Sequence, residues 1–385
     1  SEGAISWRGH SDTEVMLETI SKWGIEQALP KFTGMFAIAL FDRQDRKLYL
    51  IRDRMGEKPL YYGWCSGAFV FGSELKALRK YPGFIGEIDR DALALYLRYM
   101  AVPDPFTIYK RIYKLQPGCL VSLDLGSAIN FPDGVTPHTP LSINGFRLSR
   151  WWSLRDVVES GQGSLVADEA GALEQLESRL RDSVRLQSLA DVPLGAFLSG
   201  GIDSSLITAL MQSESNSPIN TFTIGFQEKK YNEAEHASAV ARHLGTKHVE
   251  LYVTAKDALD VIQRLPHLYD EPFADSSQIP TYLLCSQAKK YLTVALSGDA
   301  GDELFGGYNR YLWVRKIWDK ISWLPIGTRR LLAKAIFSLP SRYWDAVYSW
   351  VSYLLHSSSH LSFVGQKLHN LAERLVNIKY EDELF

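Results

Sequence analysis

Hydrophobic residues in the first part of the chain come in short runs that turn-forming residues interrupt. Runs of this length, rich in aromatic and aliphatic side chains, are typical of β-strands, and their close spacing favours antiparallel neighbours. A helical period precedes them and ends at Gly24, and two more helices are predicted after them, the second capped by Asp89. The expected strands are 35–42, 47–53, 59–64 and 68–73, and the expected helices are 12–24, 73–80 and 89–100.

The pattern changes after residues 126–148, which are rich in Pro, Gly, Ser and Asn and which we interpret as a loop. Beyond it, apolar runs alternate with helical periods. This alternation is typical of an α/β domain with a parallel sheet covered by helices on both faces. We therefore expect two domains, 1–150 and 165–385. The expected strands of the second are 192–198, 219–226, 247–253 and 291–298, its helices are 172–189, 203–213, 232–245, 255–265 and 277–290, and residues 302–385 are expected to be helical throughout.

Composition excludes several classes of protein. The 385 residues are 46% hydrophobic and 22% charged, as in ordinary globular proteins, and a net charge of -2 indicates neither a nucleic-acid partner nor an acidic membrane surface. The most membrane-like stretch, residues 343–355, is too short to span a bilayer and contains Asp345. No signal-peptide pattern is visible, and the widely spaced Cys65, Cys119 and Cys285 fit reduced thiols, so we expect a cytoplasmic protein.

Residues 192–205, "VPLGAFLSGGIDSS", join an expected strand to an expected helix. Glycines let backbone N–H groups approach a ligand, and a helix N-terminus adds unpaired donors, so this stretch predicts a phosphate cradle. It is not a Walker A loop, because no Gly-Lys-Ser/Thr follows. A carboxylate at Asp203 would repel phosphate unless Mg²⁺ lay between them. The alternative is an ordinary turn in which Asp203 or Ser204 caps the helix.

A second stretch, "VALSGDAGDELFGGY" (residues 294–308), repeats the design. Ser297 and Gly298 follow an apolar strand, and Asp299, Asp302 and Glu303 come next. These carboxylates repel one another unless a cation or hydrogen bonds compensate; the alternative is a solvated acidic turn. Because parallel sheets bind ligands beyond the carboxyl ends of their strands, we expect the two stretches to converge on one metal-bound nucleotide.

A third stretch, "YDEPFADSSQIPTY" (residues 269–282), mixes acids, hydroxyls and prolines between two expected helices. It could line the pocket for an acceptor substrate. It could equally be a helix stop followed by a serine N-cap.

The motifs resemble those of a known family. "LSGGIDSS" looks like the pyrophosphate signature of N-type ATP pyrophosphatases, and "TFTIGF", "DEPFADSSQIPTY" and "ALSGDAGDELFGGYNRY" follow in the order seen in glutamine-hydrolysing asparagine synthetases. "RGHSDTEVML", "FTGMFAIALFD", "IRDRMGEKPLYYG" and "FGSELKAL" resemble that family's N-terminal-nucleophile glutaminase half. The resemblance implies an antiparallel-sheet class II amidotransferase domain followed by a parallel-sheet, adenine-nucleotide α-hydrolase-like synthetase domain with a helical C-terminal part.

It also implies an activity. In this family ATP activates the side-chain carboxylate of aspartate as β-aspartyl-AMP, and ammonia from glutamine then displaces AMP to give asparagine. The implied cofactors are ATP and Mg²⁺, the partners are these small substrates, and a homodimer is usual. Two alternatives stay open: a relative that amidates another carboxylate, such as a sugar acid, a peptide or a lactam precursor, and a non-catalytic homologue.

The matching motifs assign roles to individual residues. Asp203 and Asp302 would bind Mg²⁺, Asp299 would assist adenylate formation, and Asp12 would hold the α-amino group of glutamine. The pyrophosphate would be held by Ser199, Gly200, Gly201, Asp203 and Ser204, and the nucleotide site would be lined by Leu198, Ile224, Ser297 and Gly298. We interpret Arg52 and Asp53 as a structural salt bridge rather than as catalysts.

The chain departs from the family pattern at its two ends. It begins at Ser1, without the N-terminal cysteine nucleophile, and neither Cys65 nor Cys119 stands in a suitable motif, so the chain as given is not expected to hydrolyse glutamine. The lysine-bearing helical segment that follows "YEDELF" in the family has no counterpart. We therefore interpret the chain as a fragment that lacks both ends. Ala300 also stands where the family has glycine or another small residue.

Overall fold

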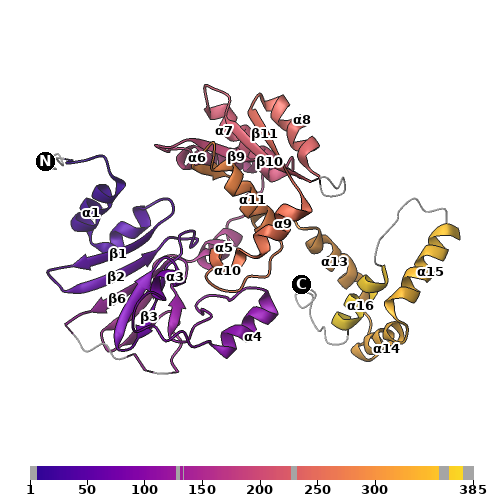
Figure 1. Ribbon diagram of the computed structural model, residues 1–385, viewed down its shortest axis with the longest axis horizontal. Coiled ribbons are helices and arrows are strands. Elements are labelled where there is room, and N and C mark those ends of the chain that lie inside the picture. The colour runs from indigo at the N-terminus through magenta and orange to yellow at the C-terminus, as the bar shows by residue number, and fades with distance from the viewer. Residues whose placement is uncertain (1–6, 127–130, 133, 227–231, 355–363, 376–385) are drawn as a thin grey trace. The chain divides into compact units, whose positions relative to one another are not determined.

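The computed structural model describes residues 7–126, 131–132, 134–226, 232–354 and 364–375 (Figure 1). The chain divides into two compact units. The second consists of Ile202–Leu206 and Ser297–Phe385, and the first consists of the remainder. Each unit is described by itself.

The first unit begins with two antiparallel sheets. One has the order β1-β2-β6-β8-β7 and the other has the order β4-β3-β5. The pairing of β1 with β2 and of β3 with β4 confirms the prediction for sequence neighbours, but β2 and β3 lie in different sheets. The strands are β1 (Ala37–Asp42), β2 (Lys47–Arg52), β3 (Tyr61–Cys65), β4 (Ala68–Gly72), β5 (Ile112–Lys114), β6 (Cys119–Asp124), β7 (Leu141–Ile143) and β8 (Phe146–Arg150).

Side chains from both sheets share one core. Tyr62 and Trp64 of β3 pack with Val121 of β6 and Phe146 of β8, and Phe131 stacks on Trp64 with ring centroids 4.2 Å apart. This layered antiparallel arrangement agrees with the predicted fold class for the first part of the chain.

The prediction that residues 126–148 form a loop is wrong at the end of that stretch. β7 and the start of β8 form a hairpin there, and Ile143 pairs with Phe146 across Asn144 and Gly145. Both turn residues have positive φ, 44° and 76°, which is the conformation that Asn-Gly favours in two-residue hairpins. The Asn-Gly pair was therefore the signal that the loop-like composition concealed.

The helices around these sheets begin and end where local signals predict. Gly24 ends α1 with φ of 75°, and the Asp89 carboxylate accepts the N–H groups of Asp91 and Ala92 at the start of α4. The described helices of this part are α1 (Asp12–Trp23), α2 (Ile25–Ala28), η1 (Leu29–Lys31), α3 (Leu75–Leu78), α4 (Arg90–Tyr99) and α5 (Leu154–Gln162).

A parallel sheet of order β11-β10-β9-β12 completes the first unit and confirms the predicted α/β pattern. Side chains alternate between its faces: Ala196 packs with helices α6 and α7, whereas Phe197 packs with α11. Its elements are α6 (Glu169–Gln187), β9 (Leu194–Phe197), α7 (Ile202–Glu214), β10 (Asn220–Phe226), α8 (Ala234–Leu244), β11 (Lys247–Val253), α9 (Ala255–Ile262), α10 (Leu265–Leu268), α11 (Gln278–Ala288) and β12 (Val294–Leu296); the first turn of α7 belongs to the second unit.

The second unit is helical, as predicted. Helices α15 and α16 pack closely, because a Cβ at Gly365 would overlap the Ser341 carbonyl, and the Gly365 N–H donates to Asp345 at 2.8 Å. The described helices are α12 (Gly301–Phe305), α13 (Asn309–Ile321), α14 (Ile326–Phe337), α15 (Ser341–Leu354) and α16 (Val364–Leu375). The predicted helical residues 355–363 and 376–385 lie outside the described part. Among the described residues, none of the helices has the length and apolar character needed to cross a bilayer.

Candidate functional site

Two strands of the parallel sheet end side by side. β12 pairs with β9 in parallel, with Leu296 opposite Ala196, so both chains leave the sheet at the same edge. This confirms that the strands preceding the two Ser-Gly stretches are neighbours. Edges of this kind, at the carboxyl ends of parallel strands, are where such sheets bind ligands.

The first glycine after β9 is required by its surroundings. Gly200 has φ of 82°, and a Cβ there would lie 2.8 Å from the Ala237 amide nitrogen. The Gly201 N–H donates to Ser199 Oγ at 3.2 Å, and Gly201 is the N-cap of α7. Asp203 is therefore inside the first turn of α7, and the structure does not bear out the alternative that Asp203 or Ser204 caps this helix.

Within the second unit, the residues after β12 pack directly on the first turn of α7. A Cβ at Gly298 would lie 2.6 Å from the Ser204 amide nitrogen and 3.0 Å from the Asp203 carbonyl carbon. A Cβ at Gly301 would lie 2.5 Å from the Asp203 carboxylate carbon. The two stretches that sequence analysis singled out thus meet in space, and Asp203 lies half-buried against the start of α12.

The acidic residues after β12 have separate neighbours. Asp299 accepts the Ser297 hydroxyl at 2.8 Å, and Glu303 accepts the Tyr308 hydroxyl at 2.5 Å. The Asp302 carboxylate lies beside Gly307, where a Cβ would be 2.1 Å from Oδ1. The described ranges contain no group of three or more His, Cys, Asp or Glu side chains that could hold a metal ion.

These residues fit a phosphate-bound Mg²⁺ better than a site made of protein ligands alone. Magnesium is commonly held by one or two carboxylates together with substrate phosphates. The Asp203 carboxylate is at a helix N-terminus, in close contact with Gly298 and Gly301, where any larger side chain would overlap it. The pairing of Asp203 with Asp302 on one ion stays a prediction.

Two residues predicted to line the nucleotide site have side chains in the core. Leu198 packs with Ala237 and Ala241, and Ile224 packs against the cluster of Val253 and its neighbours. Any contact of the buried Leu198 with a nucleotide would therefore come from its backbone, whereas the Ile224 side chain is only partly buried.

The predicted glutamine-binding residue is at a helix start. Asp12 is the first residue of α1 and is exposed, and its Oδ1 faces the hydroxyls of Ser11 and Thr13 at 3.4 Å each. The thiols of Cys65 and Cys119 are free and buried, and burial raises the pKa of Cys119 to about 11. A thiol with so high a pKa is a poor nucleophile, in agreement with the sequence interpretation.

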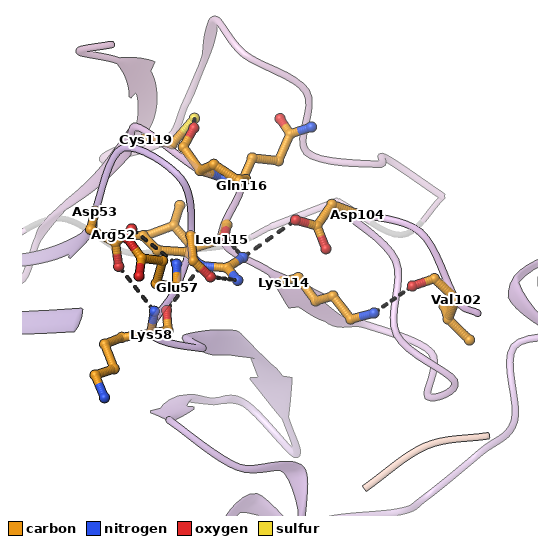
Figure 2. Close-up of polar contacts among 12 residues, drawn as sticks. Arg52, Asp53, Glu57, Lys58, Val102, Asp104, Lys114, Leu115, Gln116 and Cys119 are labelled. Atoms are coloured by element: carbon orange, nitrogen blue, oxygen red, sulfur yellow. Dashed lines mark hydrogen bonds and ion pairs between the residues drawn. The ribbon is translucent and has the colours of Figure 1, made fainter. Parts of the chain in front are cut away.

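Arg52 and Asp53 are structural, but they do not pair with each other (Figure 2). The buried Asp53 accepts the N–H groups of Phe36, Glu57 and Lys58. Arg52 donates to the Leu115 carbonyl at 2.6 Å and to the carbonyls of Gly56 and Lys58, and it pairs with Asp104 at 3.3 Å. The expected salt bridge between sequence neighbours is therefore wrong, because backbone N–H groups occupy the Asp53 carboxylate and other acceptors occupy the Arg52 guanidinium.

The stretch at 269–282 combines a helix stop with an unexpected contact. α10 ends at Leu268, and the Asp275 carboxylate, rather than the Ser277 hydroxyl, accepts a backbone N–H at the start of α11. Asp270 and Glu271 hold backbone N–H groups of Leu75 and Ile108. Sequence analysis missed this role, since partners so far apart along the chain leave no local signal.

Comparisons with known proteins match both parts of the chain. The family described as asparagine synthase matches residues 175–379, and the family described as glutamine amidotransferase domain matches residues 1–130.

Individual relatives agree with these matches. A putative glutamine-hydrolysing asparagine synthetase 2 of Methanocaldococcus jannaschii is 35% identical over 78% of this chain and 55% of its own length. Asparagine synthetase 1 of Bacillus subtilis is 35% identical over 78% of this chain and 44% of its own length. A putative asparagine synthetase of Mycobacterium bovis is 32% identical over 86% of this chain and 48% of its own length. The chain thus spans about half the length of the curated relatives that it matches. The match to a solved glutamine phosphoribosylpyrophosphate amidotransferase of B. subtilis covers 65% of this chain and 56% of the solved chain, with 11% sequence identity. Its TM-score of 0.24 is too low to bear on the fold.

Proposed function

Because this chain belongs to the asparagine synthase family, we propose that it is part of an ATP-dependent ligase that converts aspartate to asparagine. The observation that carries the proposal is the packing of Gly298 and Gly301 on the first turn of α7, beside the Asp203 carboxylate. A helix N-terminus that carries a carboxylate, with two glycines packed against it inside the second unit, is suited to a metal-bound pyrophosphate.

The proposed chemistry has two steps. The aspartate side-chain carboxylate attacks the α-phosphorus of ATP and pyrophosphate leaves, which makes an acyl-adenylate. Ammonia then attacks the acyl carbon and AMP leaves. The first step is needed because a carboxylate cannot expel oxide, whereas AMP is a competent leaving group.

Residues of this chain would stabilise the departing pyrophosphate. Backbone N–H groups of Ser199, Gly200 and Gly201, with the Ser204 hydroxyl, would donate to its oxygens as negative charge develops. Mg²⁺ held at Asp203 and Asp302 would neutralise part of that charge. Asp299, held by the Ser297 hydroxyl, would act beside the forming adenylate.

We propose that ammonia comes from glutamine in the antiparallel part, where Asp12 would bind the α-amino group. The family match to a glutamine amidotransferase domain over residues 1–130 supports this assignment. The carboxylate of Asp12 is exposed and therefore accessible to an ammonium group.

Aspartate-dependent exchange between pyrophosphate and ATP tests the proposal in the complete protein. We expect exchange with aspartate and Mg²⁺, and its loss in Asp203→Ala with the fold retained. Exchange that requires a sugar acid or a peptide in place of aspartate would instead favour a relative with another acceptor. Normal turnover in Asp203→Ala would refute the assignment of this site.

A further inference from the structure

One segment of the parallel-sheet part reaches the antiparallel part of the same unit. Residues 269–277 connect α10 to α11, which are both labelled in Figure 1. Phe273 forms an antiparallel bridge with Ala101, and the Ala274 N–H donates to the Met100 carbonyl at 2.8 Å. Backbone contacts of this kind fix the path of the segment and do not depend on side-chain rotamers.

Asp270 makes the first side-chain contact. Its Oδ2 accepts the Leu75 N–H at 2.6 Å, and its Oδ1 faces Lys76 Nζ at 3.4 Å. Lys76 Nζ also donates to the carbonyl of Leu268, at the end of α10, at 3.2 Å. Leu75 and Lys76, at the start of α3, therefore contact both the Asp270 carboxylate and the Leu268 backbone that precedes it.

Glu271 makes the second side-chain contact between the segment and the antiparallel part. Its Oε2 accepts the Ile108 N–H at 3.1 Å, and its Oε1 forms an ion pair with Lys114, which also donates to the Val102 carbonyl. The side chains of Glu271 and Lys114 are each 13% exposed and that of Asp270 is 10% exposed. The pair of Glu87 with Lys110, by contrast, is 61% and 48% exposed.

Charges buried to this degree are costly unless both partners are present and well placed. Burial raises the pKa of Glu271, and the Lys114 ammonium and the Ile108 N–H oppose that rise. Removing either partner leaves an uncompensated charge in a poorly solvated place. The contact is therefore specific to this one arrangement of the segment.

The other end of the segment is fixed to the parallel sheet. The Asp275 carboxylate accepts the Ser277 N–H at 2.8 Å, just before α11 begins. α11 then buries Leu284 and Ala288 in the core that contains Phe222 of β10. Glu271 therefore lies only a few residues from the stretch that precedes α11.

We propose that Asp270 and Glu271 are positioning residues, which latch residues 269–277 to the antiparallel part and so couple glutamine hydrolysis to amide synthesis. The inference rests on the proposed function. Ammonia made in one part must be used in the other before it is protonated to ammonium, which has no lone pair for attack. The paired reaction therefore requires that the antiparallel part and the parallel-sheet part keep a fixed placement.

The test uses Glu271→Gln in the complete protein. The amide retains an oxygen for the Ile108 N–H but loses the charge that pairs with Lys114. We expect the ratio of glutamate formed to asparagine formed to rise about fivefold or more, in the range typical of coupling between sites, while glutaminase activity and ammonia-dependent synthesis each stay near wild type. Glu87→Gln, which breaks the exposed pair with Lys110, is the matched control and should leave the ratio unchanged.

Hydrogen exchange supplies a readout that does not depend on catalysis. Peptides containing the Leu75 and Ile108 amides should exchange faster in Glu271→Gln. If that variant does not fold, Asp270→Asn, which keeps an acceptor for Leu75 and loses the charge facing Lys76, takes its place.

An unchanged product ratio in a folded variant would overturn the latch. A wild-type protein without aspartate-dependent exchange would instead overturn the proposed function. In that case the protection of the Leu75 and Ile108 amides decides on the latch, and equal exchange in variant and wild type would refute it.

Discussion

Substituting alanine at Gly298 perturbs the candidate site through one added carbon atom. The new Cβ would lie 2.6 Å from the Ser204 amide nitrogen, and an ordinary contact is 3.4 Å or more, so the backbone of the first turn of α7 must retreat by about 0.8 Å. Overpacking of this kind costs about 1–3 kcal/mol. A catalytic group displaced by about 1 Å costs on the order of 100-fold in rate.

Gly301→Ala separates the two effects. Its Cβ would meet the Asp203 carboxylate carbon at 2.5 Å, and a side chain can rotate away where a backbone cannot. We expect Gly301→Ala to change the free energy of unfolding by about 1 kcal/mol or less. It should reduce aspartate-dependent exchange about as much as Gly298→Ala does. Gly327→Ala in α14 is the matched control, since no atom lies within 4 Å of its Cβ.

The assays are urea denaturation for stability and pyrophosphate–ATP exchange for chemistry, both on the complete protein. Gly298→Ala should lose both stability and exchange activity. Gly301→Ala should lose exchange activity alone, and Gly327→Ala should lose neither. Wild-type exchange in both Gly298→Ala and Gly301→Ala would refute the assignment of this packing contact to the reaction.

Further predictions concern stability. Ala300 has φ of 70°, so Ala300→Gly should raise the free energy of unfolding by about 1 kcal/mol, measured by urea denaturation; no gain would mean that this strain is absent. Burial lowers the pKa of His248 below 6.5, so the unfolded chain binds a proton that the folded chain does not, and stability should fall as pH drops below 6.5. His248→Asn should reduce the dependence of the free energy of unfolding on pH, measured by urea denaturation at a series of pH values. The same dependence in the variant and the wild type would contradict this prediction. Leu50→Ala in the sandwich core should cost about 2–5 kcal/mol, whereas Leu97→Ala, 75% exposed, should change stability by about 0.5 kcal/mol or less; equal effects would refute the core assignment.

Local signals predicted the elements well. The alternation of strands and helices after residue 172 indicated the parallel sheet, because each apolar run had to be buried on both faces. Capping at Gly24 and Asp89 followed from backbone chemistry that acts within one turn. The hairpin at Asn144 and Gly145 was missed since loop-like composition outweighed a two-residue turn signal.

Contacts between distant segments were not predictable in the same way. The packing of Gly298 on Ser204 was foreseen only as a convergence of two motifs, and its closeness depends on backbone geometry. Asp53 and Arg52 were correctly considered structural, but their partners, such as Phe36 and Leu115, are distant along the chain and only tertiary folding brings them close. Asp270 gave no sign of its partner at Leu75, because tertiary folding alone brings them together.

A crystal structure of the complete protein with Mg²⁺ and ATP tests the proposed site most directly. We expect the β- and γ-phosphates against the backbone N–H groups of Ser199, Gly200 and Gly201 and the Ser204 hydroxyl, with the metal ion on Asp203. A nucleotide bound away from the ends of β9 and β12, or phosphates with no metal ion near Asp203, would contradict the proposed site.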